Sequence, residues 1–515
     1  MHRTCEAGSI SLRSAPLLCT RSRGEVSSAS SKITGQRTCH WVLEPTRNRR
    51  EPIQIRAGIT RRPFNPQAAE IHQAPHHEWS GPDDAADRAG SPIRLLWALL
   101  VTIEYSPGRY RRWQPSAAAG ETVAMLGTPF SPWPSFTQDE ARAISRVLLS
   151  NRVNYWTGTE CREFEREFAA WVGTTHAVAL ANGTVALDLA LKALNIGSGD
   201  DVIVTPRSYV ASASCVVTAG ARPVFADVDS ESQNITASTI RRVLTSRTRA
   251  IICVHLAGMP CEMDPIMALA QEHDLKVIED CAQAHGARYR GRMVGGIGHI
   301  GAWSFCQDKI MTTGGEGGMV TTSDRSLWAA MWSYKDHGKS WEAVYDHKHP
   351  PGFRWLHESF GTNWRMLEMQ AVIGRLQLNR MQEWTARRSA NAARLTEVCR
   401  RFPVLRVPAV SSHLVHAWYR FYAFVNASQL AEGWTRDRIV QEISQAGVPC
   451  YHGSCSEIYL EKAFDATAFR PPRPLSTARE LGETSLMLLV HPTLTEAEMD
   501  LTCAVLEDVL SRAER

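Results

Sequence analysis

The stretch that decides the fold is a short apolar run ending in two acids and an amide, Val277-Ile278-Glu279-Asp280-Cys281-Ala282-Gln283. A buried strand that ends in polar side chains is typical of α/β folds, which bind ligands at the carboxyl edge of their sheet. At that edge, a carboxylate such as Asp280 could hold a heteroaromatic nitrogen in its protonated state. The alternative is an ordinary helix cap or a surface acid.

Similar apolar runs recur on both sides of this stretch and are separated by helical patterns. The runs predict strands at 177–181, 202–205, 223–226, 250–256, 276–278, 302–305 and 319–321. Apolar side chains recur at helical spacing over 184–194, 211–219, 237–244 and 265–273. Buried strands that alternate with helices predict an α/β fold, with a mostly parallel sheet covered on both faces.

The pattern changes in the last third of the chain. A long helical pattern over 365–399 leads to a predicted strand at 418–425 and to helices at 437–446 and 497–510. We therefore predict a large domain over 125–375 and a smaller α+β C-terminal domain over 376–515.

The first quarter of the chain differs from the rest in charge and pattern. The 515 residues include 57 Lys and Arg and 53 Asp and Glu, a net charge of +4. Residues 1–124 hold 17 of these basic and 11 of these acidic side chains, which leaves 40 and 42 for 125–515. Because 1–124 also shows no lasting hydrophobic period, we expect a disordered or mis-annotated extension. A transit-peptide-like leader and an arginine-rich segment for an acidic partner are the alternatives.

Membrane and metal sites have little support in the sequence. The best apolar run, 93–103, includes Arg94 and is shorter than the roughly 18–20 residues that a membrane span needs. The 13 cysteines form no CxxC pair and no zinc-like spacing with histidine. We expect a cytoplasmic protein with reduced thiols, without a metal site and without a membrane or nucleic-acid partner.

Three features of the large domain point to one chemistry. The turn Asn182-Gly183-Thr184, between a strand and a helix, offers backbone N–H groups and a hydroxyl to a phosphate. Lys309 follows an apolar strand and precedes a glycine-dense segment, where partial burial would favour a nucleophilic amine. Each feature alone is commonplace. With Asp280 they match pyridoxal 5′-phosphate (PLP), which needs an anion cradle, a ring clamp, a carboxylate for its ring nitrogen and a lysine for its aldehyde.

The chain resembles the DegT/DnrJ/EryC1/StrS family of sugar aminotransferases, which have the aspartate-aminotransferase fold (PLP fold type I). The resemblance covers about 130–510 and is carried by residues 164–169, 182–187, 220–229, 255–260, 279–287, 304–309 and 361–366. Two departures stand out. Asn182 replaces the usual serine of the phosphate turn, and one extra glycine lies between Lys309 and Glu316.

The resemblance implies a role for each candidate site residue. Lys309 would be the Schiff-base lysine and proton shuttle, and Asp280 would pair with the ring nitrogen. The implied cofactor contacts are Gln283 at the phenolic oxygen, Gly183, Thr184 and Ser304 at the phosphate, Tyr209 stacked on the ring, and Asn363 at the phosphate of the neighbouring subunit. The last contact implies a homodimer with shared active sites.

The resemblance also implies the reaction. We expect PLP-dependent transamination of a nucleotide-linked keto-sugar by an amino-acid donor such as glutamate, for amino-sugar, polysaccharide or secondary-metabolite biosynthesis. The alternatives are a keto-inositol aminotransferase, a PLP sugar dehydratase and a non-catalytic regulatory relative. Lys309 argues against the dehydratase, because that branch of the family has histidine at this position.

Overall fold

A seven-stranded sheet forms the centre of residues 130–515, which are the residues that the computed structural model describes. Its strands are, in order across the sheet, β1 (His176–Leu180), β9 (Gly318–Thr322), β8 (Ile300–Ser304), β5 (Lys276–Asp280), β4 (Thr248–Val254), β2 (Asp201–Val204) and β3 (Arg222–Phe225). From β8 to β3 all neighbours are parallel, whereas β9 is antiparallel to both of its neighbours. The predicted mostly parallel α/β sheet is therefore confirmed. The extension predicted over 1–124 lies outside the described residues.

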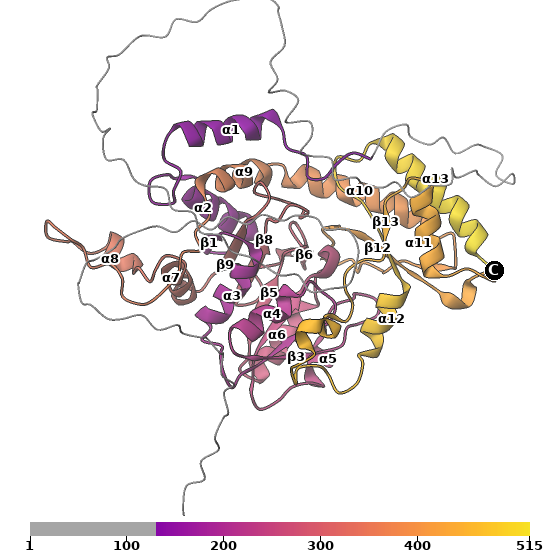
Figure 1. Cartoon of the computed structure of the whole chain (residues 1–515), viewed down its shortest axis with the longest axis horizontal. Helices are drawn as coiled ribbons and strands as arrows, with labels where there is room; N and C mark the ends of the chain where they lie inside the picture. The colour runs from indigo at the N-terminus through magenta and orange to yellow at the C-terminus, as the bar shows by residue number, and fades with distance from the viewer. Residues whose placement is uncertain (1–129) are drawn as a thin grey trace, which may run out of the picture. The chain divides into compact units, whose positions relative to one another are not determined.

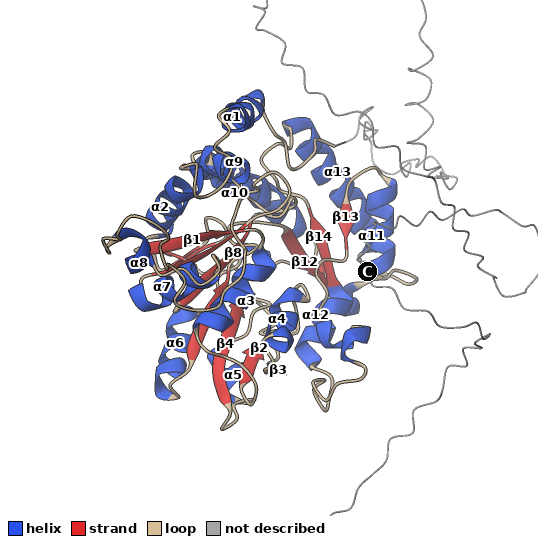
Figure 2. Ribbon diagram, turned by 60° about the vertical axis from the view of Figure 1, so that its left-hand side comes forward, coloured by secondary structure: helices blue, strands red, loops and turns tan. Residues whose placement is uncertain are grey.

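Both faces of this sheet are covered because its strands are apolar on both sides (Figure 2). In β1, Val178 and Leu180 belong to one core cluster while Ala177 and Ala179 belong to another, as the alternation of a strand requires. The helices of this part of the chain are α2 (Glu160–Val172), α3 (Gly183–Ala193), α4 (Ala211–Thr218), α5 (Ala237–Arg241), α6 (Met263–Glu272), α7 (Arg325–Tyr334) and α8 (Trp341–Tyr345).

A second sheet lies in the C-terminal part of the chain. Its four antiparallel strands are β10 (Leu405–Arg406), β12 (Phe421–Val425), β14 (Ser485–Leu488) and β13 (Cys450–Tyr451). It shares an apolar core with α10 (Met381–Cys399), α11 (Arg436–Gln445) and α13 (Glu496–Ala513) (Figure 1). We propose that this group is the C-terminal domain predicted over 376–515. The remaining elements are α1 (Gln138–Leu149), α9 (Glu368–Leu378), α12 (Ser476–Thr484) and a small sheet of β6 (Arg288–Tyr289), β7 (Arg292–Met293) and β11 (Leu414–Val415).

The helical pattern predicted over 365–399 corresponds to two helices, α9 and α10, rather than one. Arg365 pairs with Leu180 in a β-bridge, so the helix begins only after Leu367. The two helices are separated by a tight turn, in which the Arg380 N–H donates to the Gln377 carbonyl at 2.9 Å. Likewise, the strand predicted from residue 418 begins at Phe421, because Trp418 has a left-handed backbone with φ of 51°.

Within 130–515, no helix combines the length and the apolarity that a bilayer crossing requires.

Candidate active site

A cavity of about 580 Å³ opens at the carboxyl edge of the large sheet. Its lining includes the last residues of three parallel strands, Val254, Asp280 and Ser304. Seven of the eight predicted site residues line this cavity, namely Gly183, Thr184, Tyr209, Asp280, Gln283, Ser304 and Lys309. The strand-end position predicted for the site therefore agrees with the geometry.

The eighth predicted residue, Asn363, does not line this cavity. It is exposed and pairs with Asp336 in an antiparallel bridge. Its role at a neighbouring subunit stays a prediction.

The N-terminus of α3 forms an anion cradle. The Asn182 side chain caps the helix by accepting the Val185 N–H at 3.0 Å, which leaves the Gly183 and Thr184 N–H groups in the first turn. Gly183 also lies against β8, where an added Cβ would come within 2.5 Å of the Ser304 Cβ. Only glycine brings the turn this close to the Ser304 hydroxyl. The positive end of the helix, two N–H groups and two hydroxyls suit a phosphate.

Asp280 is buried at the end of β5 and belongs to a chain of hydroxyls. It accepts the Ser212 hydroxyl at 2.9 Å and the Ala282 N–H at 3.2 Å. The Ser212 oxygen lies 2.9 Å from the Ser208 hydroxyl, which lines the cavity. Burial raises the pKa of Asp280 despite these bonds and the nearby Lys309 charge. A cationic ring nitrogen in the cavity would lower it again, because an opposite charge favours the ionised carboxylate.

Lys309 lies at the edge of the cavity with 16% of its side chain exposed. Its Nζ is 3.5 Å from an Asp308 carboxylate oxygen and 5.2 Å from the Tyr419 ring centroid, and the Tyr419 hydroxyl donates to Asp308. Burial opposes ionisation of Asp308, but the charge of Lys309, the Tyr419 hydroxyl and Arg420 outweigh it and lower the pKa of Asp308. Asp308, whose side chain is 49% exposed, is therefore placed to hold the lysine amine.

Gln283 and Tyr209 line the same cavity in different ways. The Gln283 side-chain oxygen accepts the Ala257 N–H at 2.7 Å, which fixes the amide and leaves its NH₂ group as a donor. Tyr209 is 70% exposed, so its ring is free to cover a planar ligand.

Several side chains of this site are not among the residues predicted from the sequence. Ser208, Ser212, Asp308 and Tyr419 were not singled out. Ser208 precedes α4 and Ser212 lies in its first turn, so helical spacing does not link the two in the sequence. Tyr419 gave no signal either, because it lies 111 residues from Asp308.

Behind Asp280, three buried side chains have the donor types of a metal site, namely His255, Glu279 and Cys281. The Glu279 carboxylate accepts three backbone N–H groups between Gly295 and Gly298 at 2.6–2.9 Å and lies 3.1 Å from His255 Nε2. His255 Nδ1 accepts the Cys261 N–H at 3.0 Å. Both side chains are thus committed to structural hydrogen bonds, and the cluster anchors β5.

Substituting Glu279 with glutamine is expected to destabilise the protein by about 2–4 kcal/mol, because the amide turns a donor toward buried N–H groups. Burial opposes ionisation of Glu279, but His255 and the backbone N–H groups outweigh it and lower its pKa. The stabilisation is therefore present above the ordinary carboxyl pKa of about 4.3 and is lost as the pH falls. Denaturant unfolding at pH 7 and pH 4 measures it. The exposed Glu272→Gln variant is the control and should change stability by less than about 1 kcal/mol.

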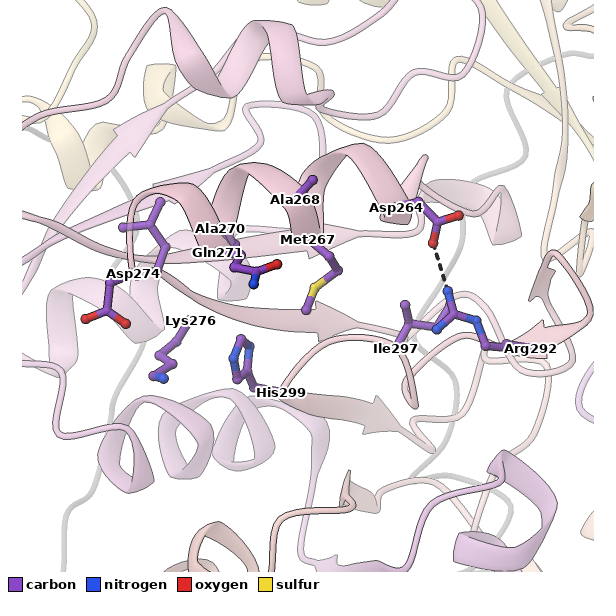
Figure 3. A pocket seen from close by; sticks show the side chains of 11 residues that line it. Asp264, Met267, Ala268, Ala270, Gln271, Asp274, Lys276, Arg292, Ile297 and His299 are labelled. Atoms are coloured by element: carbon purple, nitrogen blue, oxygen red, sulfur yellow. Dashed lines mark hydrogen bonds and ion pairs between the residues drawn. The ribbon is translucent and has the colours of Figure 1, made fainter.

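A second cavity, of about 610 Å³, lies at the other end of β5, beside Lys276 and α6 (Figure 3). Its acid Asp264 is already paired with Arg292 at 2.8 Å. It includes neither the phosphate turn nor Lys309. The first cavity is therefore the candidate active site.

Comparisons with known proteins identify the family of the chain. The model of the DegT/DnrJ/EryC1/StrS aminotransferase family matches residues 134–507. GDP-perosamine synthase of Caulobacter vibrioides is 37% identical over 358 residues, 68% of this chain and 89% of that protein. The dTDP-3-amino-3,4,6-trideoxy-alpha-D-glucose transaminase of Streptomyces venezuelae is 34% identical over 373 residues, 72% of this chain and 92% of that protein.

The solved structures give the same result. The X-ray structure of an aminotransferase from Psychrobacter cryohalolentis is 62% identical, with a TM-score of 0.74 over 75% of this chain and 100% of that chain. This likeness confirms the aminotransferase fold expected from the sequence. Since the family model spans most of the chain and these relatives are aminotransferases, the protein is an aminotransferase and belongs to the DegT/DnrJ/EryC1/StrS aminotransferase family.

Proposed function

We propose that this enzyme transfers the amine of an amino acid, with glutamate as the expected donor, to a nucleotide-linked keto-sugar, using PLP. The observation that carries the proposal is the convergence of the Gly183–Thr184 cradle, Asp280 and Lys309 on one cavity. The acceptor class is supported by the names of the relatives, a GDP-perosamine synthase and a dTDP-sugar transaminase. The family depends on PLP in general.

The residues of the cavity fit PLP. When bound, this cofactor supplies an electron sink for negative charge that develops on the substrate carbon. The cradle at Gly183 and Thr184, with the Ser304 hydroxyl, would hold its phosphate. Asp280 would keep the ring nitrogen protonated, and the Tyr209 ring would cover the ring face. The Gln283 NH₂ would donate to the phenolic oxygen.

Lys309 would do the chemistry at the substrate carbon. Its Nζ would bind the cofactor aldehyde in the resting enzyme. Once released, its amine would carry a proton from the donor carbon to the cofactor C4′ in the first half-reaction, and from C4′ to the acceptor carbon in the second. Asp308 keeps the amine within reach during this exchange, since it lies 3.5 Å away. Donor and acceptor would use the same cavity in turn, as in a ping-pong cycle.

We also propose a cytoplasmic homodimer in which Asn363 faces the neighbouring active site. The exposure of Asn363 outside its own cavity supports this arrangement.

A spectroscopic screen tests the proposed function. Purified protein is loaded with PLP, and GDP-, dTDP- and UDP-linked amino sugars are added singly to drive the half-reaction in reverse. We expect the visible band of the lysine-bound cofactor to disappear with at least one of them, and to disappear also with glutamate. Loss of the band only with an amino-inositol would favour the keto-inositol alternative. A protein that shows no such band after PLP addition would contradict the proposal.

A further inference from the structure

A short segment before α1, residues 130–134, runs from the C-terminal helices to the loop that bears Lys309. At its start, the Ser131 N–H donates to Glu498 at 2.5 Å, and the Pro132 carbonyl accepts the Thr493 hydroxyl at 2.8 Å. The next residue, Trp133, donates its indole N–H to the Lys309 carbonyl at 2.8 Å. One side chain thus joins this segment directly to the backbone of the proposed Schiff-base lysine.

The indole of Trp133 is held on several sides. Trp384 meets it edge-on with ring centroids 5.0 Å apart, and His491 stacks on it at 6.1 Å. The buried guanidinium of Arg388 lies 5.0 Å from its ring centroid. A cation over an aromatic ring draws electron density from it, which makes the indole N–H a stronger donor. These contacts fix the direction in which the N–H points.

The lysine loop has few other anchors near residue 309. The Lys309 N–H donates to the Cys306 carbonyl at 3.1 Å, which is a contact within the loop itself. Thr312, three residues on, donates its N–H to Gln377 at 2.9 Å. Among the described residues, Trp133 is therefore the side chain from outside the loop that forms a hydrogen bond with the Lys309 backbone, at its carbonyl oxygen.

We propose that Trp133 is a positioning residue for Lys309, and that its indole N–H sets the orientation from which the amine reaches the cofactor aldehyde. This inference rests on the proposed PLP chemistry of Lys309. Because Nζ lies at the far end of a long side chain, a small rotation of the Lys309 peptide would displace Nζ by much more than it displaces the backbone. Reactions between held groups are sensitive to such displacements.

The test compares Trp133→Phe with Trp434→Phe, which removes a partly buried indole of the C-terminal core that contacts neither Trp133 nor Lys309. The rate at which added PLP forms its covalent link is followed by the visible band. We expect about a fivefold slower rate for Trp133→Phe, since one hydrogen bond contributes about 1 kcal/mol, and an unchanged rate for Trp434→Phe.

A second comparison separates positioning from general structural damage. PLP affinity is measured by equilibrium dialysis in Lys309→Ala and in Lys309→Ala/Trp133→Phe. Because the effect acts through the lysine amine, we expect equal affinities. The inference is overturned if Trp133→Phe forms the link at the wild-type rate, or if the double variant binds PLP several-fold more weakly than Lys309→Ala. If the unaltered protein forms no link at all, the proposed function fails instead.

Discussion

Replacing Lys309 with alanine is expected to lower kcat/KM for transamination by at least about 10⁴-fold, because one side chain provides both the covalent link and the proton transfer. The carboxylate paired with Lys309, that of Asp308, is 49% exposed, so removal of the lysine leaves this partner accessible to water. The free energy of unfolding of the cofactor-free protein should therefore change by less than about 1 kcal/mol. Steady-state kinetics and denaturant unfolding measure the two effects.

Two control variants separate the role of the Lys309 amine from that of its charge and from the effect of removing a lysine elsewhere. Lys309→Arg keeps the positive charge beside Asp308 but cannot form the covalent link, so it should be as inactive as the alanine variant. Lys192→Ala removes an exposed lysine in the last turn of α3 and should retain full activity. An active Lys309→Arg enzyme would show that charge, rather than the amine nucleophile, is what the reaction needs.

Asp280→Asn is expected to lower kcat by about 10²–10³-fold, since the neutral amide cannot stabilise a protonated ring nitrogen. The same substitution should raise the free energy of unfolding of the cofactor-free protein at neutral pH. Burial raises the pKa of Asp280, so the folded chain loses stability relative to the unfolded chain as the pH rises from the ordinary aspartate pKa through the raised one. The asparagine side chain does not ionise, so the variant does not undergo this loss.

The sign of this pH dependence is fixed. Below the ordinary aspartate pKa of about 3.9 the carboxyl is protonated in both folded and unfolded chains, and the penalty is absent. As the pH rises through the raised pKa, the cofactor-free wild type loses stability relative to Asp280→Asn. Unfolding free energies of both proteins between pH 4 and pH 8 test this. A gap that stays constant, or that favours the wild type more at pH 8, would contradict the inference that burial of the Asp280 carboxylate raises its pKa.

The core of the site could be predicted because PLP chemistry demands particular residue types at strand ends. Gly183, Asp280 and Lys309 each follow a strand, and the carboxyl ends of parallel strands meet at one edge. The strand pattern alone does not separate Glu279 from Asp280, and it was the family resemblance that assigned the ring nitrogen to Asp280. The structure separates them, because successive side chains of a strand point to opposite faces. Asp280 lines the cavity, whereas Glu279 binds the loop before β8.

Contacts between distant residues explain what was not predicted. Ser212 lies 68 residues from Asp280, and Trp133 lies 176 residues from Lys309. Such pairs leave no periodic signal, since only the folded chain brings them together. The break between α9 and α10 was missed for a related reason. The apolar pattern continues through it, and the turn at Arg380 contains no glycine or proline to mark it.

The central claim is that Lys309 carries the cofactor, and the most direct measurement is to trap that bond. Protein loaded with PLP is reduced with borohydride, digested and mapped by mass spectrometry. We predict that the peptide containing Lys309 carries the added pyridoxyl-phosphate mass, and that Lys309→Ala carries none at that position. An unmodified Lys309 in the loaded protein, with the label on another lysine such as Lys335 or Lys339, would contradict the account.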